Sequence, residues 1–175
     1  MIRNSSEYRV PRNMRIAVYL VCMAYLIILI FLFNEPFYDD AYIFCRYARN
    51  LRTGDGLIYN NSFHGFGVSN IIWTTLVAYT ALPGLISFPF VSILLNAFFF
   101  ILSAILLGKI VKFITGSDPA GLISAAVYLL FPASQRLLLS GMDTHINTFA
   151  YLLMFYVVDR KSTRLNSSHR LRDRM

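Results

Sequence analysis

Two adjacent aspartates, Asp39 and Asp40, are the side chains of this sequence best placed to do chemistry. They follow the first long apolar run by a few residues, and an ionised carboxylate there can act as a general base or bind a cation. An aspartate just before a helix is most often its N-cap, but a cap needs only one carboxylate. We therefore expect one of the pair to cap a helix and the other, Asp40 in preference, to be functional.

A third acid, Asp143, lies in the sequence SGMDT at residues 140–144, where Gly141 permits a tight turn. Its ordinary role is again that of an N-cap, here for the apolar run that follows. If Asp143 lies on the same side of a membrane as Asp40, two carboxylates face one cavity. Such a pair supports acid–base or metal chemistry.

The residues after Asp40 have the pattern of a short amphipathic helix that ends at Gly54. Its apolar positions are Ala41, Phe44, Cys45, Ala48 and Leu51. A single apolar stripe predicts a helix that lies along the membrane surface. Arg46, Arg49 and Arg52 share roughly one face of it, where they can contact lipid headgroups or the phosphate of a ligand.

The sequence offers no spacing that is typical of a metal centre. Two adjacent aspartates can bind a divalent cation, but they are too few ligands to predict one. His64 and His145 have no second histidine or cysteine at ligand spacing, so each is expected at the surface or the interface. Cys22 and Cys45 are expected to be free, buried thiols.

The composition places these residues in an integral membrane protein of the all-α class. Apolar residues make up 57% of the 175 and charged residues only 14%, against about 25% charged in a soluble domain. Nearly all of the net charge of +7 lies in residues 1–15 and 159–175, which flank an apolar body, residues 16–158. Basic flanks are typical of membrane topology, whereas a nucleic-acid-binding protein clusters its cations on a folded surface.

Four apolar runs are expected to cross the membrane, the third of them broken by Pro132. They are residues 16–33, 90–111, 120–139 and 144–158. A fifth run, residues 70–88, is interrupted by Pro83-Gly84 and is expected to be interfacial or re-entrant.

Basic residues decide the orientation of these spans. Four arginines precede the first span, and Lys109 and Lys112 end the second. Both groups fall inside if the N-terminus is cytoplasmic and residues 34–89 and 139–143 are external. The expected protein is therefore a multi-pass membrane protein, with a cytoplasmic arm at residues 1–15.

The order of these features resembles the start of the GT-C superfamily, the membrane glycosyltransferases that use polyprenyl-phosphate sugars. The likeness is carried by FYDDAYIFCRYARNLRTGDGLIYN at residues 37–60, FGVSNIIW at 66–73 and SGMDT at 140–144. It is strongest to bacterial proteins related to the mycobacterial arabinofuranosyltransferases, which tend to read DDAYI-x-x-RYA-x-N-L-x-x-G-x-GL in the first external loop.

The resemblance implies a location in the bacterial inner (plasma) membrane and a role for each candidate residue. Asp40, together with Asp39, would be the catalytic base or would position the acceptor hydroxyl, and Asp143 would be the second acid of the external cavity. The three arginines would hold the phosphate of the polyprenyl-phosphate sugar donor, and the acceptor would be a glycan or a lipid-linked molecule. Two positions depart from the family pattern: Phe66 stands where relatives often carry glutamate, and SGMD replaces the more usual SGME.

Members of this superfamily have many more spans, and often a soluble C-terminal domain. The last residues, STRLNSSHRLRDRM, change composition abruptly and look like translated sequencing-adapter DNA. We therefore expect an N-terminal fragment with a non-native tail at residues 159–175, the alternative being a genuine basic, disordered tail.

A non-enzymatic membrane protein, such as a transporter or flippase subunit, is the competing interpretation. In that case Asp39 and Asp40 would serve as a cap and the arginines would bind anionic lipid. A coupled transporter usually carries ionisable groups at mid-span, and the first two predicted spans carry none there. This difference favours chemistry at the external face.

Overall fold

The structure is a computed structural model that describes residues 9–32, 37–60, 67–82 and 86–172, and the side chains as far as residue 158. It is all-α, as the sequence predicts. The helices in these ranges are α1 (Arg12–Leu32), α2 (Asp39–Thr53), α3 (Ile71–Thr80), α4 (Phe88–Thr115), α5 (Asp118–Leu130), α6 (Pro132–Leu139) and α7 (Thr144–Arg172). His64 and Phe66 lie outside the described residues.

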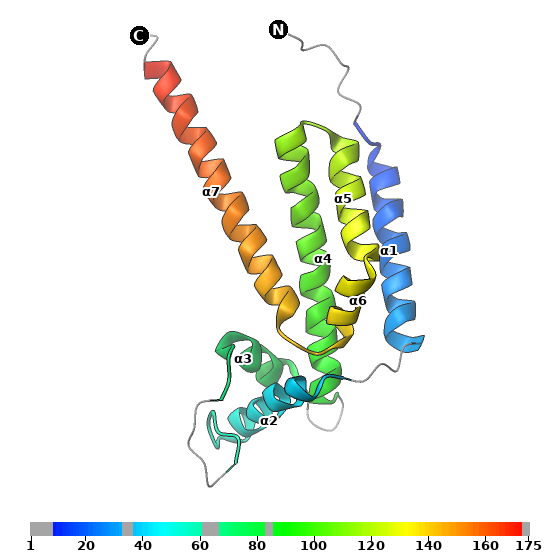
Figure 1. Cartoon of the computed structure of the whole chain (residues 1–175), viewed down its shortest axis with the longest axis vertical. Helices are drawn as coiled ribbons and strands as arrows, with labels where there is room; N and C mark the ends of the chain where they lie inside the picture. The colour runs from blue at the N-terminus through cyan, green and yellow to red at the C-terminus, as the bar shows by residue number, and fades with distance from the viewer. Residues whose placement is uncertain (1–8, 33–36, 61–66, 83–85, 173–175) are drawn as a thin grey trace.

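The long helices run up and down, and helices α2 and α3 lie together at one end of them (Figure 1). The chain descends through α1, ascends through α4, descends through α5 and α6, and ascends through α7. The start of α1, the end of α4 and the start of α5 therefore share one end, which we call the arm end. Helices α2 and α3 and the turn before α7 lie at the other end, the α2–α3 end.

Within the part of the chain that the structure describes, two helices, α1 and α4, are long and apolar enough to cross a membrane, and α5 with α6 makes a third if the pair is one bent span. This pair bends by 54° at Pro132, whose ring locks φ and removes the backbone donor of a continuous helix. Many large apolar side chains of α1 are exposed, including Leu20, Val21 and Phe31. In contact with lipid such side chains carry no penalty, so the structure supports a membrane protein.

The remaining apolar segments are shorter. Helix α3 has ten residues, too few to cross, which agrees with an interfacial or re-entrant segment 70–88. The apolar part of α7, Thr144–Val158, also falls short of a full span, so the fourth span stays a prediction. The backbone of α7 continues as a helix to Arg172, through most of the expected non-native or disordered tail at residues 159–175.

Helices α4 and α5 form a tight antiparallel pair because two glycines face each other. A Cβ placed on Gly108 would lie 2.8 Å from the carbonyl oxygen of Gly121, and one placed on Gly121 would lie 2.5 Å from that of Gly108. Small residues that let helix backbones approach closely are the usual basis of helix association in lipid, where apolar burial drives nothing.

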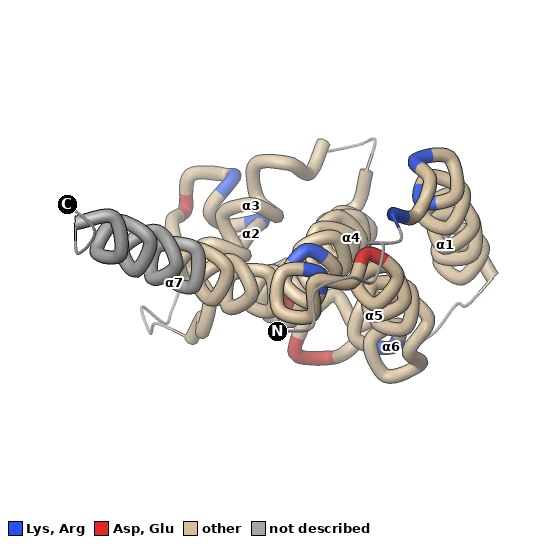
Figure 2. Tube along the Cα trace, turned by 90° about the horizontal axis from the view of Figure 1, so that it is seen from above, with Lys and Arg blue, Asp and Glu red and all other residues tan. Residues whose placement is uncertain are grey.

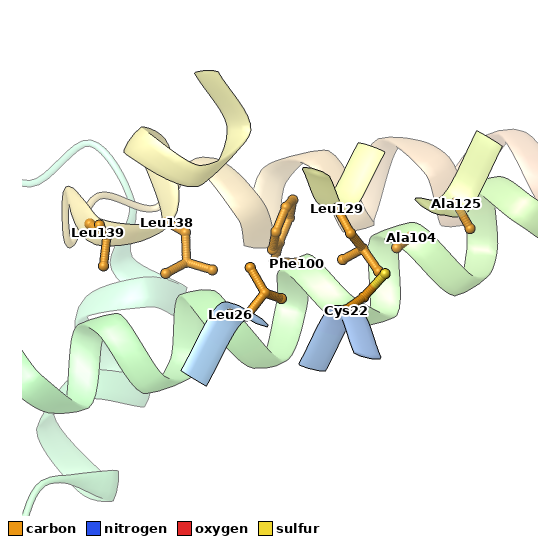
Figure 3. Close-up of a cluster of buried hydrophobic side chains, with 8 residues drawn as sticks. All are labelled: Cys22, Leu26, Phe100, Ala104, Ala125, Leu129, Leu138 and Leu139. Atoms are coloured by element: carbon orange, nitrogen blue, oxygen red, sulfur yellow. The ribbon is translucent and has the colours of Figure 1, made fainter. Parts of the chain in front are cut away.

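One apolar cluster ties α1 and α6 to this pair (Figure 3). Its buried members are Cys22, Leu26, Phe100, Ala104, Ala125, Leu129, Leu138 and Leu139. The cluster fixes the direction of α6, and α6 in turn delivers the chain to the turn before α7.

The sequence predicts that the apolar stripe of helix α2 faces a membrane surface. In the structure this stripe is covered by protein instead. Phe44 and Ala48 are buried in a cluster with Trp73 and Val77 of α3, and Cys45 lies against Ser92 of α4, with Sγ and Oγ 3.8 Å apart. The prediction of an amphipathic helix is confirmed, but its apolar face packs against α3 and α4. As predicted, α2 ends at Gly54, whose φ of 91° is left-handed.

The docking of α2 predicts the reactivity of Cys45. This thiol is free and buried, and burial raises its pKa to about 11. Because only the thiolate reacts, labelling of Cys45 by a maleimide at pH 8 should be at least about a hundredfold slower than that of an exposed thiol. The measurement compares Cys22→Ala protein with a Cys22→Ala, Cys45→Ala, Tyr42→Cys variant, which carries its thiol on the exposed face of α2. Equal labelling rates in the folded proteins would show that α2 is not docked.

Candidate functional site

Neither Asp39 nor Asp40 is the N-cap of helix α2, which carries both. Tyr38 is the N-cap of α2, with φ −65° and ψ 141°, and its side chain makes no capping hydrogen bond. The expectation that Asp39 or Asp40 caps the helix is therefore wrong, because the chain turns helical one residue earlier than the capping pattern requires. Both carboxylates lie in the first turn, where the helix dipole favours negative charge.

Both aspartates are exposed, and neither has a hydrogen-bond or ion-pair partner among the described residues. A carboxylate that is not engaged in capping keeps its oxygens available to a ligand. The structure thus leaves Asp39 and Asp40 equally available, where the sequence analysis had assigned one of them to the helix.

The turn that contains Asp143 meets the start of α2 directly. The Tyr38 backbone N–H donates to the carbonyl oxygen of Ser140 at 3.2 Å. The ring of Phe37 lies where a side chain at residue 141 would be: a Cβ on Gly141 would be 1.9 Å from Phe37 Cε2. We call these contacts of residues 37–38 with 140–141 the junction. It brings the segment that bears Asp39 and Asp40 to the segment that bears Asp143, at the α2–α3 end of the molecule.

Asp143 is held by two asparagines that the sequence analysis did not single out. Its Oδ2 accepts hydrogen bonds from the side-chain amides of Asn70 at 2.8 Å and Asn147 at 2.9 Å. Asn70 also caps α3, since its Oδ1 accepts from the backbone N–H of Trp73 at 3.0 Å. One residue thus joins the start of α3 to the start of α7 and orients the carboxylate of Asp143.

Signals for both asparagines were present in the sequence. Asn147 lies one helical turn after Asp143, a spacing at which side chains meet. Asn70 immediately precedes an apolar helix, the position where asparagine is a favoured N-cap. What the sequence did not show is that the two amides converge on one carboxylate oxygen, because that convergence depends on α4, which both α3 and α7 contact.

The three arginines of α2 have different environments. The half-buried Arg52 donates to the carbonyl oxygens of Ala78, at 2.7 Å, and Ala81, which end α3. These are helix-terminal carbonyls without intrahelical partners, so Arg52 stabilises α3. Arg46 is exposed and donates through Nε to the carbonyl oxygen of Tyr59 at 3.2 Å, and Arg49 is exposed. Arg46 and Arg49 are thus the members of the expected phosphate-binding face that remain accessible.

His145 is buried, so the expectation of a surface or interfacial histidine is wrong at this position. Only 1% of the residue is exposed, and Nε2 lies 3.1 Å from the carbonyl oxygen of Ser134. Its ring also packs on Phe100, with the centroids 4.6 Å apart. Within the described residues, no three histidine, cysteine, aspartate or glutamate side chains form a group that could hold a metal ion.

No family model, curated protein or solved structure matches the chain significantly. The interpretation of the site therefore depends on the residues and contacts described above.

The junction predicts an unequal response of two glycines to alanine. Both Gly54 and Gly141 have left-handed φ, 91° and 75°, but only Gly141 faces a neighbouring ring. Gly54→Ala should lower the free energy of unfolding by about 1 kcal/mol, the cost of the backbone conformation. Gly141→Ala should lower it by about 3 kcal/mol, because displacing Phe37 adds an overpacking cost. Thermal unfolding in detergent, followed by circular dichroism, measures both, and equal losses would contradict the junction.

Proposed function

We propose that this chain belongs to a membrane glycosyltransferase, which transfers a sugar from a polyprenyl-phosphate donor to a cell-envelope acceptor outside the cytoplasm. In this proposal α7 supplies a fourth span, and the protein resides in the bacterial inner membrane with its N-terminus in the cytoplasm. The observation that supports it most strongly is the junction. Two segments that each resemble a GT-C motif are far apart in the chain and meet at one end of the bundle.

The charge of the two ends supports the proposed orientation. Lys109 and Lys112 of α4 lie at the arm end with the start of α1, and the chain leaves α7 towards the same end (Figure 1). Positive residues accumulate on the cytoplasmic side of membrane proteins. The α2–α3 end, with its carboxylates, then faces the outside, where polyprenyl-phosphate sugars are used as donors.

The proposed reaction is a displacement at the anomeric carbon of the sugar. Asp40 accepts the proton of the acceptor hydroxyl, and the acceptor oxygen forms a bond to the anomeric carbon as the bond to the donor phosphate oxygen breaks. Polyprenyl phosphate leaves with the electron pair. The exposed cations of Arg46 and Arg49 are suited to stabilise the charge that develops on it.

The other two acids would position substrate. Asp39 shares the first turn of α2 with Asp40, so both carboxylates lie at the positive end of the helix dipole. Asp143 has one oxygen fixed by two amides, so its carboxylate has a defined orientation toward a sugar or acceptor hydroxyl. Arg52 enters the proposal only through α3, whose end it holds.

One observation favours the alternative, a transporter or flippase subunit. His145 is an ionisable residue buried between helices of the bundle, and such residues often lie on transport pathways. Its ring nitrogens, however, lie within hydrogen-bonding reach of the Ser134 carbonyl and, at 3.4 Å, the Tyr128 hydroxyl. These contacts join α5, α6 and α7, and a structural role accounts for them.

Asp40→Asn tests the enzyme proposal. In membranes containing the product of the complete parent gene, the variant should transfer label from radiolabelled polyprenyl-phosphate sugars at least about a hundredfold more slowly than wild type, the usual contribution of a general base. The matched control is Asp55→Asn, which removes an exposed acid just beyond the same helix. It should transfer label at the wild-type rate.

Either of two results would refute this assignment. One is normal transfer by Asp40→Asn. The other is the absence of transfer by the wild-type protein across a panel of polyprenyl-phosphate pentoses and hexoses, with the protein present and folded in the membrane.

A further inference from the structure

We propose that a cavity at the arm end binds the headgroup of an anionic phospholipid. The cavity has a volume of about 210 Å³ and lies between α1, α4 and α5. Its polar lining comprises Arg15, Lys109, Lys112 and Asp118. A second cavity, of about 260 Å³, shares three of these residues and adds Arg9. Both lie at the opposite end from the carboxylates discussed above, so this site is independent of the proposed transferase site.

The buried acid of this cavity already has its partners. The side chain of Asp118 is 5% exposed; its Oδ1 lies 2.6 Å from Lys112 Nζ and its Oδ2 accepts from the Val10 backbone N–H at 3.1 Å. Lys112 therefore neutralises Asp118. Arg15 is more distant, 3.9 Å from Asp118 and 44% exposed, and Lys109 is exposed. Asp118 is the one carboxylate among the described lining residues, and it faces three cations, so the cavity keeps a net positive charge.

Figure 2 shows this arrangement from above the arm end, with the basic end of α4 beside the acidic start of α5. A phosphate diester that enters the cavity would meet Arg15 from α1 and Lys109 from α4. Such a ligand would join α1 to the α4–α5 pair by contacting a cation from each side.

The rest of the lining favours a lipid over a soluble phosphate. Tyr19, Ile105 and Leu122 continue the cavity along the apolar surfaces of the same three helices. Cations at the end of a span and apolar side chains below them match the order of headgroup and acyl chain in a membrane leaflet. Basic pockets between transmembrane helices on the cytoplasmic side are known to bind anionic headgroups.

The experiment titrates the purified chain in a neutral detergent with phosphatidylglycerol and, separately, with phosphatidylcholine, and counts bound lipids by native mass spectrometry. Phosphatidylglycerol should bind more tightly than phosphatidylcholine. Arg15→Gln combined with Lys109→Gln should weaken it roughly thirtyfold, because each cation near an anionic lipid contributes about a factor of five. Both substitutions leave the Lys112–Asp118 ion pair intact.

Two control variants separate charge from folding. Arg136→Gln removes an exposed cation from α6, away from the cavity, and should bind phosphatidylglycerol as wild type does. Arg15→Lys combined with Lys109→Arg keeps both charges and should retain binding. If the neutral double variant and the charge-conserving one lose binding equally, the loss comes from folding or shape and the proposal fails.

A competition experiment with inorganic phosphate shows whether the cavity binds a lipid headgroup or any phosphate. Inorganic phosphate at the same concentration should not displace phosphatidylglycerol, because it lacks the acyl chains that contact the apolar lining. Displacement by inorganic phosphate, or wild-type binding by the neutral double variant, would overturn the proposal.

Discussion

The absence of a side chain at Gly141 is the constraint on which the candidate site depends. It leaves the space that Phe37 fills, and with that ring in place the Tyr38 N–H reaches the carbonyl oxygen of Ser140. The contact connects the chain that leaves α1 to the turn between α6 and α7. A residue with a Cβ at this position would separate the two segments, and the carboxylates they carry would no longer belong to one region.

The packing of the long helices supports the junction. The Gly108–Gly121 approach fixes α5 against α4, and Pro132 then bends the chain so that α6 ends near the start of α7. From the other side, α2 is held by its apolar stripe on α3 and α4 and by Arg52 at the end of α3. Asn70 completes the arrangement, because it caps α3 and also binds Asp143. The site is therefore built from helix ends, where backbone and side-chain polar groups are available to a ligand.

Periodicity and composition were sufficient to predict the class of the fold, the positions of the apolar runs and the short helix that Gly54 ends. They could not predict features that depend on which helices pack against one another. The stripe of α2 has the same pattern whether it faces lipid headgroups or Trp73, so the sequence could not distinguish the two. The capping pattern pointed to Asp39 or Asp40, but the cap is Tyr38. Its backbone N–H donates to the carbonyl oxygen of Ser140, a contact between distant segments that a local capping pattern does not show. His145 was misplaced for the same reason, since a lone histidine carries no periodic signal of its burial.

A cross-link between the two sides of the junction tests the account most directly. In a Cys22→Ala, Cys45→Ala background, Tyr38→Cys is paired with Met142→Cys, and the folded protein is treated with a short bifunctional maleimide. The control pairs Tyr38→Cys with Gly116→Cys, which lies at the arm end. The account predicts that the first pair is cross-linked efficiently and the control is not, as judged by fragments that stay joined after cleavage of the chain between the two positions. Failure of the first pair to cross-link above the control would show that the two acidic segments do not meet, and the proposed site would have no structural basis.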